Sequence, residues 1–202
     1  MGNTVGRTNT TFCDLTQPHN AYAFGLWCAD GYHRTSSIGL TNVNYALIDE
    51  FKRFLLKFFP QERLKRLKMR IYSREESPEH YYSKKATRPA YQLYVNSRPF
   101  LRYFRVAREN PEQFLNKNST FAYFAGRFDG DGSVAADDRS DLRIAYSGNE
   151  EANRDAQLLA RIGIIPRVYK YTKARTFVLY VSRFDAQRFL SGISEFSLRR
   201  RK

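Results

Sequence analysis

The chain has 202 residues, of which 42% are hydrophobic, so it is long enough to bury a sizeable core and too apolar for a disordered tail. Its 34 lysines and arginines against 20 acidic residues give a formal net charge of +14, which suggests a polyanionic partner. No apolar run reaches the roughly 18 residues of a membrane span, and two cysteines exclude a Cys-rich zinc site. The polar start lacks the apolar stretch of a secretory signal, so we expect an intracellular protein of the cytoplasm, the nucleoid or an organelle.

The chain contains an internal repeat. Residues 21–31 read AYAFGLWCADG, and residues 121–132 read FAYFAGRFDGDG, so both are apolar segments that end in a small residue followed by Asp-Gly. A second pair, QLYVNSR at 92–98 and VLYVSR at 178–183, follows in the same order. Repeated order with unequal spacing indicates two copies of one unit that differ in loop length.

The first copy begins with a helix over the apolar segment and continues with a strand around Ile38 and Leu40. Apolar residues at helical spacing predict a helix from 47 to 58, which Pro60 ends. Residues 67–74 alternate between apolar and polar and predict a strand that pairs with a strand through 92–96. The polar segment 75–89 between these strands predicts a long loop, which we expect to extend the contact with a nucleic acid.

The second copy follows a linker at residues 109–118 and has the same order. It has a strand around Leu142 and Ile144, a helix over about 149–162, and paired strands near 167–173 and 178–181. Each copy therefore reads as helix, strand, helix, strand, strand, helix.

One face of each predicted sheet is rich in Arg, Lys, Tyr, Gln and Asn. Residues 51–108 carry 16 basic and four acidic side chains, and residues 161–183 carry six basic and none acidic. Such side chains contact phosphates and base edges, whereas the alternative is a solvated face of an antiparallel sheet. The candidates for nucleic-acid contact in these strands and loops are Lys68, Arg70, Tyr72, Arg74, Lys84, Lys85, Arg88, Gln92, Tyr94, Asn96, Arg143, Arg167, Tyr169, Lys170, Tyr171, Lys173, Arg175 and Tyr180.

Each apolar helix carries two small residues four positions apart: Gly25 and Ala29, and Gly126 and Gly130. This spacing lets two helices pack backbone to backbone, which would bring Asp30 and Asp131 close together. An acid at a helix C-terminus opposes the helix dipole, and two such acids repel each other. Divalent cations relieve both effects, and carboxylates that hold Mg²⁺ are a recurring device for cleaving phosphodiesters. Asp129, two residues before Asp131, is better explained as a structural or salt-bridging residue.

The two segments resemble the signature motifs of single-chain LAGLIDADG homing endonucleases, and the element order extends the resemblance over roughly residues 12–200. The resemblance implies an α+β fold of two pseudo-symmetric αββαββ-type halves, 1–108 and 119–202, with antiparallel sheets that form a DNA-binding saddle and motif helices at the central interface. One early strand per half would then be hidden in 32–41 and 133–147. It also implies a monomeric, Mg²⁺-dependent endodeoxyribonuclease that cuts a double-stranded target across the minor groove, leaves short 3′ overhangs and needs no protein partner or membrane.

The resemblance also implies roles for particular residues. Asp30 and Asp131 would be the metal ligands, and the backbone carbonyls of Ala29 and Gly130 would lie near the metals. A polar residue at the end of the strand before the second helix often positions water; Asn42 fits that place and Ser147 is its weaker counterpart. A basic residue late in each half often supports the scissile phosphate, and Lys117 and Arg199 are the candidates by position.

Three residues depart from the family pattern: Trp27 and Cys28 in the first motif, and Arg127 in the second. A charged residue on an interface helix must point outward or pair with an acid. Two other functions stay open. One is a non-cleaving nucleic-acid binder of the same fold, either an intron RNA maturase or a DNA-binding regulator. The other is a plain basic RNA-binding protein, for which paired acids have no use.

Overall fold

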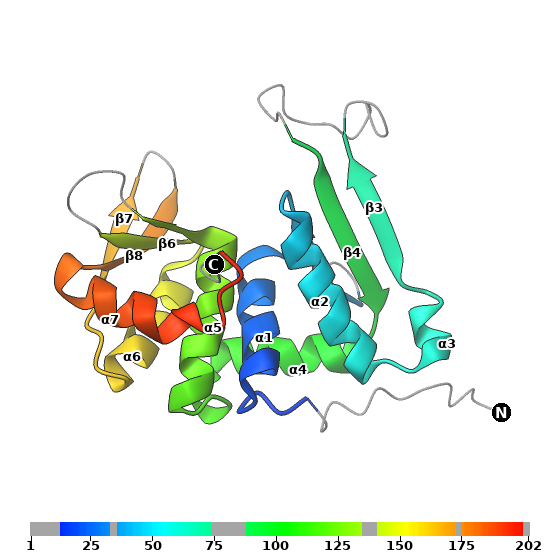
Figure 1. Cartoon of the computed structure of the whole chain (residues 1–202), viewed down its shortest axis with the longest axis horizontal. Helices are drawn as coiled ribbons and strands as arrows, with labels where there is room; N and C mark the ends of the chain where they lie inside the picture. Colours follow the sequence, from blue (N-terminus) through cyan, green and yellow to red (C-terminus); the bar gives the residue numbers. More distant parts are fainter. Residues whose placement is uncertain (1–12, 33–35, 74–87, 135–140, 173–174, 200–202) are drawn as a thin grey trace. The chain divides into compact units, whose positions relative to one another are not determined.

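A computed structural model describes residues 13–32, 36–73, 88–134, 141–172 and 175–199 (Figure 1). The first repeat contains α1 (Pro18–Asp30), β1 (Gly31–Tyr32), β2 (Ser37–Asn42), α2 (Tyr45–Phe58), α3 (Gln61–Leu64), β3 (Lys68–Tyr72), β4 (Ala90–Asn96) and α4 (Arg98–Glu109). The second contains, after a short 3₁₀ helix (Pro111–Gln113), α5 (Lys117–Asp131), β5 (Gly132–Val134), β6 (Leu142–Tyr146), α6 (Asn149–Arg161), β7 (Arg167–Tyr171), β8 (Thr176–Val181) and α7 (Arg183–Ser194).

The order of elements confirms the predicted repeat. Apart from the short α3 of the first copy, both copies read αββαββα, and the early strands expected from the family resemblance are β1 and β5, which begin directly after Asp30 and Asp131. Pro60 follows α2, as predicted. Among the described residues no helix is both long enough and apolar enough to cross a membrane.

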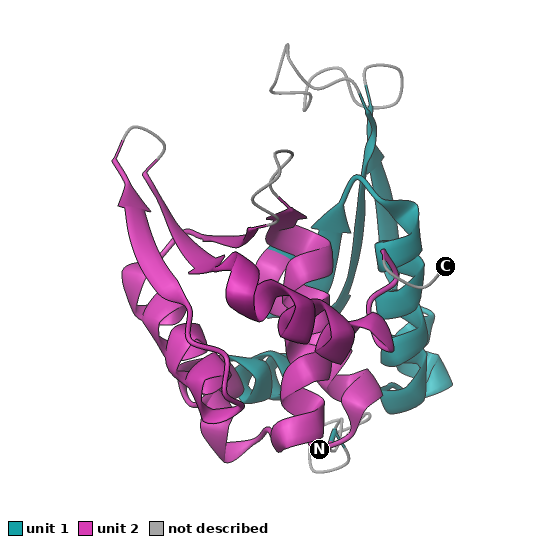
Figure 2. Cartoon of the chain, turned by 60° about the vertical axis from the view of Figure 1, so that its left-hand side comes forward, with its two compact units in different colours: residues 1–13, 30–105 teal, residues 14–29, 106–202 magenta. Residues whose placement is uncertain are grey.

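The chain forms two compact units, which Figure 2 shows in two colours. Unit 1 consists of residues 1–13 and 30–105, and unit 2 of residues 14–29 and 106–202. The units differ from the predicted halves in two respects: nearly all of α1 belongs to unit 2, and so do residues 106–118. The division into halves at the linker 109–118 stays a prediction.

The packing of α1 on α5 explains why α1 belongs to unit 2. A Cβ atom built on Gly25 would overlap the carbonyl oxygen of Tyr123, and one built on Gly126 would overlap the carbonyl oxygen of Tyr22. The two backbones are therefore in direct contact at these glycines, which confirms the interpretation of the small residues. The rings of Phe24 and Tyr123 add a contact with centroids 5.3 Å apart.

Unit 1 holds a four-stranded antiparallel sheet in the order β1-β2-β4-β3. The register pairs Ile38 with Val95 and Leu40 with Leu93, so these side chains share the face that α2 covers. Behind this face α2 and α4 pack through aromatic rings; the Phe54 centroid lies 5.8 Å from that of Phe100. The opposite face is polar, because the pleat alternates as the sequence predicts.

Unit 2 holds an equivalent sheet in the order β5-β6-β8-β7. Ile144 pairs with Leu179, and their face packs on α6 and α5. Lys170 pairs with Phe177 on this same side of the sheet, whereas Arg167 and its alternate neighbours lie on the polar side. The position of Lys170 therefore gives no support to its prediction as a DNA contact.

Part of the predicted nucleic-acid surface lies outside the described residues. This applies to Arg74, Lys84, Lys85 and Lys173, and to all of the long loop 75–89 except its last two residues. Arg88, at the near end of that loop, is exposed and precedes β4.

Candidate functional site

Asp30 is held by a hydrogen bond from the end of the neighbouring strand. The Nδ2 atom of Asn42 donates to Oδ2 of Asp30 at 2.7 Å, and the backbone N–H of Asn44 donates to Oδ1 of Asn42 at 2.6 Å. Because the amide oxygen of Asn42 is occupied, its nitrogen side must face the carboxylate. Asn42 thus lies beside Asp30, and its amide donates to the Asp30 carboxylate.

Asp131 closes α5 beside a basic side chain from the C-terminal segment. The Nη1 atom of Arg199 donates to the carbonyl oxygens of Phe128 and Gly132 at 3.2 and 3.0 Å. A cation at a helix C-terminus interacts favourably with the helix dipole and satisfies carbonyls that lack partners within the helix. Arg199, one of the two predicted basic residues, therefore lies at the end of α5 that carries Asp131.

The structure supports the structural interpretation of Asp129. Its buried carboxylate accepts hydrogen bonds from the Tyr22 hydroxyl at 2.7 Å, the Ser197 hydroxyl at 2.6 Å and the backbone N–H of Leu198 at 2.7 Å. These bonds join α5 to α1 and to the segment that carries Arg199.

Lys117 lies far from the site for which it was predicted. It is the first residue of α5, fourteen residues before Asp131, which corresponds to about 21 Å along a helix. At this N-terminal end the Asn116 side chain donates to the carbonyl oxygen of Thr16, just before α1. The prediction failed because the residues between the repeats offered no periodic pattern by which to align the lysine.

The structural counterpart of Asn42 is Tyr146, not Ser147. The glycines that follow the two acids pair with Leu40 in β2 and with Ile144 in β6. Two residues further along each strand lie Asn42 and Tyr146, so the sequence alignment was wrong by one residue. Ser147 is exposed beyond the end of β6.

Arg127 is buried in unit 2 and pairs with two acids of α6. Its side chain is only 1% exposed, and its nitrogens lie 3.4 Å from Glu151 and 3.3 Å from Asp155. The guanidinium also stacks over the ring of Tyr146 at 4.2 Å. Of the two options that the sequence left open, pairing with an acid is therefore the correct one.

Further hydrogen bonds hold the two acids of α6, Glu151 and Asp155, and together with Arg127 these residues form a buried polar network. The hydroxyls of Tyr123 and Tyr146 donate to Asp155 at 3.0 and 2.7 Å, and Arg108 donates to Glu151 through two nitrogens. Burial raises the pKa of Asp155 despite these partners. Burial would also raise the pKa of Glu151, but the hydrogen bond from Arg108 brings that pKa below its usual value.

Cys28, a departure from the family motif, lies beside this network. Burial raises the pKa of its thiol to about 12. A thiol in that state stays protonated at neutral pH.

The polar face of unit 1 is built in two layers. Gln92 is only 7% exposed and lies in the lower layer. The Tyr72 hydroxyl donates to its Oε1 at 3.0 Å, and its Nε2 donates to the Thr41 hydroxyl at 3.2 Å. Tyr94 is 8% exposed and lies 5.0 Å from the ring of Tyr32. Gln92 and Tyr94 therefore support this face rather than project from it.

Above that layer Lys68 and Arg70 on β3 are exposed. The Arg70 guanidinium lies 5.5 Å from the centroid of the Tyr94 ring. Asn96 is exposed at the end of β4, where it accepts from Ser37 at 2.6 Å. Of the predicted contacts in unit 1, these side chains are best placed to reach a ligand.

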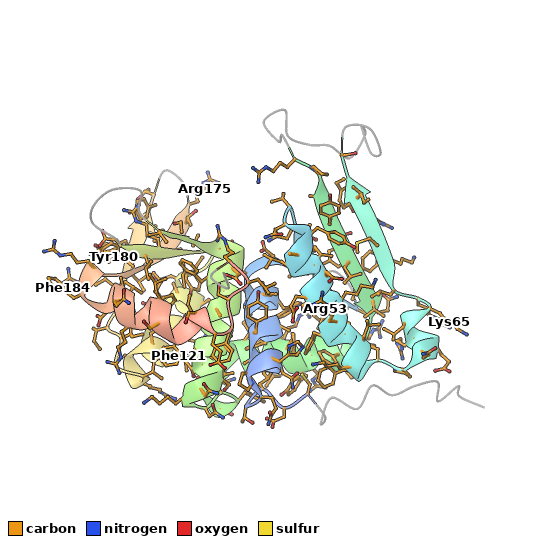
Figure 3. All side chains as sticks on the ribbon, in the orientation of Figure 1. Arg53, Lys65, Phe121, Arg175, Tyr180 and Phe184 are labelled. Carbon is orange, nitrogen blue, oxygen red and sulfur yellow. The ribbon has the colours of Figure 1, made fainter. Side chains whose placement is uncertain are left out.

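The polar face of unit 2 centres on Tyr180, which pairs with Arg143 on one side and Arg167 on the other. The Tyr169 ring lies 5.7 Å from that of Tyr180. Arg175, at the turn between β7 and β8, has a φ of 52° and is exposed (Figure 3). Tyr171 is also exposed, on the same face as Tyr169.

The oxygens around each acid suit a hard divalent cation. Each acid follows a residue, Ala29 or Gly130, whose carbonyl lies in the last helical turn, where carbonyls lack partners within the helix. Within the described ranges no three His, Cys, Asp or Glu side chains cluster as a complete metal cage. Mg²⁺ commonly binds one or two carboxylates and completes its shell with water and substrate phosphates, so the donor set fits such an ion.

A family model described as the LAGLIDADG-like domain matches the chain twice, at residues 17–107 and 118–194. The two matches cover most of the chain and fall on its two repeats. The comparison with curated proteins gave no match.

Solved structures share the fold at low identity. A mesophilic variant of the homing endonuclease I-DmoI is 18% identical with a TM-score of 0.63, over 89% of this chain and 96% of that chain. The homing endonuclease I-WcaI, bound to its DNA recognition sequence, is 12% identical with a TM-score of 0.66, over 98% and 91%. The N-terminal LAGLIDADG domain of WhiA is 16% identical with a TM-score of 0.59, over 96% and 93%. Further structures of I-DmoI contain DNA with Mn or with Ca.

Proposed function

Because the chain belongs to the LAGLIDADG family, we propose that it is a site-specific endonuclease of double-stranded DNA. The observation that carries the proposal is that both repeats contain the motif acid, Asp30 or Asp131, and that each acid is the last residue of its motif helix. A protein that only bound nucleic acid would have no use for an acid at either helix end, where it opposes the helix dipole.

The two polar sheet faces support a DNA substrate. Both carry arginine beside tyrosine, the exposed Arg70 near Tyr94 and the half-buried Arg143 paired with Tyr180, and the chain has a net charge of +14. Arginine side chains contact phosphates and guanine edges in the major groove. The similarity to I-WcaI and I-DmoI, both solved with DNA, agrees with this substrate.

The reaction would be hydrolysis of one phosphodiester in each strand across the minor groove, with short 3′ overhangs. A bound Mg²⁺ ion would activate water and neutralise charge on the leaving oxygen. Asp30 and Asp131 would hold such ions, and Asn42 would keep the Asp30 carboxylate in its orientation. Arg199 stays on the carbonyls of α5, so its contribution would be to fix the helix end rather than to transfer a proton.

The test is cleavage of a plasmid library of randomised inserts by the full chain, with Mg²⁺ or with a chelator. We expect a defined set of inserts to be cut only with Mg²⁺, with short 3′ overhangs in the sequenced ends. The other candidate is a LAGLIDADG protein that binds nucleic acid without cutting it. Selective capture of inserts with no cleavage in any divalent cation would establish that candidate instead.

A further inference from the structure

The helical side of unit 1 carries a set of exposed basic side chains. They come from the end of α2, from the residues just after α3 and from one face of α4: Lys57, Lys65, Arg66, Arg98, Arg102 and Arg105. Lys65 projects beyond the end of α3 (Figure 3). Of the acidic residues that the structure describes on these helices within unit 1, only Glu62 is exposed. We call these basic residues the α4 surface.

Contacts between the helices bring the α4 surface together on one side of unit 1. The Phe100 ring of α4 lies 5.9 Å from that of Phe58 and 5.4 Å from that of Phe59, at the end of α2. The Nη1 atom of Arg63 in α3 donates to the carbonyl oxygen of Asn96, just before α4, at 2.8 Å. Because α2 covers the apolar face of the sheet and α4 packs behind it, a duplex on the polar face of unit 1 would leave the α4 surface uncovered.

The arginines of α4 are arranged at a cost to the helix. Arg98, Arg102 and Arg105 are four and three residues apart, so they follow one another on one exposed face over about 10.5 Å. Like charges at this spacing repel each other, and a cation at the first helical residue opposes the helix dipole. Within the described part of the chain no acid forms an ion pair with Arg98 or Arg102. Helix stability therefore does not explain this row.

The fold does not require the row either. In the second repeat the helix that corresponds to α4 is α7, and only its first arginine, Arg183, has a counterpart in α4. Gln187 and Leu190 occupy the positions that correspond to Arg102 and Arg105. The row of arginines is thus a property of the first repeat, which points to a ligand.

The composition of the α4 surface favours a phosphate backbone as that ligand. The guanidinium group presents a planar fork of N–H donors that matches phosphate oxygens. Single-stranded nucleic acids bind through stacking on aromatic rings, and the α4 surface contains none. The large apolar side chains that are exposed on these helices, Tyr45, Leu56 and Val106, are scattered, so they do not form the apolar face that inserts into a membrane or docks a protein.

We propose that the α4 surface is a second site for duplex DNA, which binds the phosphate backbone without sequence preference. Over the about 10.5 Å from Arg98 to Arg105 one strand of a duplex presents about three phosphates. A chain with this site holds one duplex on its polar sheet faces while it contacts another, and so passes directly between DNA segments. This transfer rests on the proposed DNA function of the polar faces, whereas binding to the α4 surface does not.

The first measurement is the number of duplexes bound per chain. The full chain is titrated at low salt, without divalent cation, with a short duplex of unrelated sequence in excess, and the complexes are followed by sedimentation. We expect two duplexes per wild-type chain and one per chain of the double variant Arg98→Glu/Arg102→Glu. For the second binding event the slope of log K against log salt should become shallower by about two.

The matched control is Arg161→Glu/Arg183→Glu, which changes the charge equally at exposed positions of unit 2. It should still bind two duplexes. Glutamate is favourable at the start of a helix, so Arg98→Glu should not unfold α4, and urea unfolding of both double variants should match the wild type. One duplex per wild-type chain, or the same loss in the control, would overturn the proposal.

The second measurement tests transfer between duplexes. The dissociation rate of a labelled duplex from the wild type and the control should rise in proportion to the concentration of unlabelled duplex, and in Arg98→Glu/Arg102→Glu it should stay nearly constant. A rate that does not depend on competitor in the wild type would overturn transfer. Tighter binding of an RNA duplex, or of vesicles that contain phosphatidylserine, would overturn the assignment to DNA. Neither measurement requires cleavage, so absence of cleavage in the insert library would refute the endonuclease proposal and leave this one standing.

Discussion

The two sheets share strand order and register but place their positive charge differently. Tyr94 and Tyr180 occupy the same central position on the two polar faces. Across from Tyr94 on the inner strand is Gly39, which leaves room for the tyrosine rings above it; a Cβ there would overlap the backbone of β4. Across from Tyr180 is Arg143.

In the neighbouring row of paired residues the arginine lies in unit 1 and has no counterpart in unit 2. In unit 1 Gln92 lies between Thr41 and Arg70, and its amide is fixed by hydrogen bonds. In unit 2 the equivalent of Gln92 is Val178, and Tyr169 takes the place of Arg70. Equal folds therefore carry unequal recognition surfaces, which suits a non-palindromic target.

The largest expected effect concerns the acid that ends the motif helix of each repeat, a feature that the two repeats share. Asp30→Asn or Asp131→Asn should abolish double-strand cleavage and leave DNA affinity nearly unchanged, because each acid is proposed to hold metal rather than to maintain the fold. Strand-resolved cleavage and a metal-free binding assay measure this. A variant that still makes double-strand breaks, or that unfolds, would contradict the assignment.

The next largest effect is on the free energy of unfolding. Loss of a buried ion pair in unit 2 should cost more stability than loss of a surface ion pair in unit 1. Arg127→Leu leaves buried acids without their cation and should cost about 3–5 kcal/mol in urea unfolding. The control is Arg53→Leu on α2, whose side chain is 64% exposed and bonds Asp49 at 2.6 Å (Figure 3). It should cost under about 1 kcal/mol, and equal losses would show that burial does not matter here.

A smaller effect should separate the two recognition surfaces. Arg70→Ala should relax base preference at one position of one half-site by about 1–3 kcal/mol, and Arg143→Ala should do the same in the other half-site. Selection of target sequences by each variant measures this. Loss of affinity without any change in preferred bases would identify these residues as phosphate contacts instead.

The smallest expected effect is a pH dependence of the unfolding free energy, which arises from Glu151 in unit 2. The pKa of Glu151 is lower in the folded chain than its usual 4.5, so its ionised form adds stability above about pH 4.5, and this is lost as the pH falls through the lower folded value. Glu151→Gln should flatten that part of the profile of unfolding free energy against pH. Glu150→Gln is the matched control, because its side chain is 91% exposed. A similar profile change in both variants would refute the role of burial.

The sequence alone was sufficient to predict the order of elements, which follows from local periodicity, and the position of the two acids, which follows from the repeated motif. It was insufficient where partners come from distant segments. Arg127 could not be assigned its acids before α6 was placed beside α5, and Gln92 looked exposed because alternation does not show that Tyr72 and Thr41 cover it. Counting from the motif placed Ser147 one residue away from the true counterpart, since the strand pairing sets the register.

The packing of α1 on α5 also has a consequence for how the chain is made. Gly25 and its partner Gly126 are about a hundred residues apart in sequence, and synthesis proceeds at roughly 5–20 residues per second. The apolar first helix therefore leaves the ribosome about 5–20 s before the surface it packs against has been synthesised. During that interval its buried residues, from Ala21 to Cys28, are exposed, so unit 2 completes its folding only after α5 emerges, and chaperones that bind apolar segments have their best opportunity on this helix.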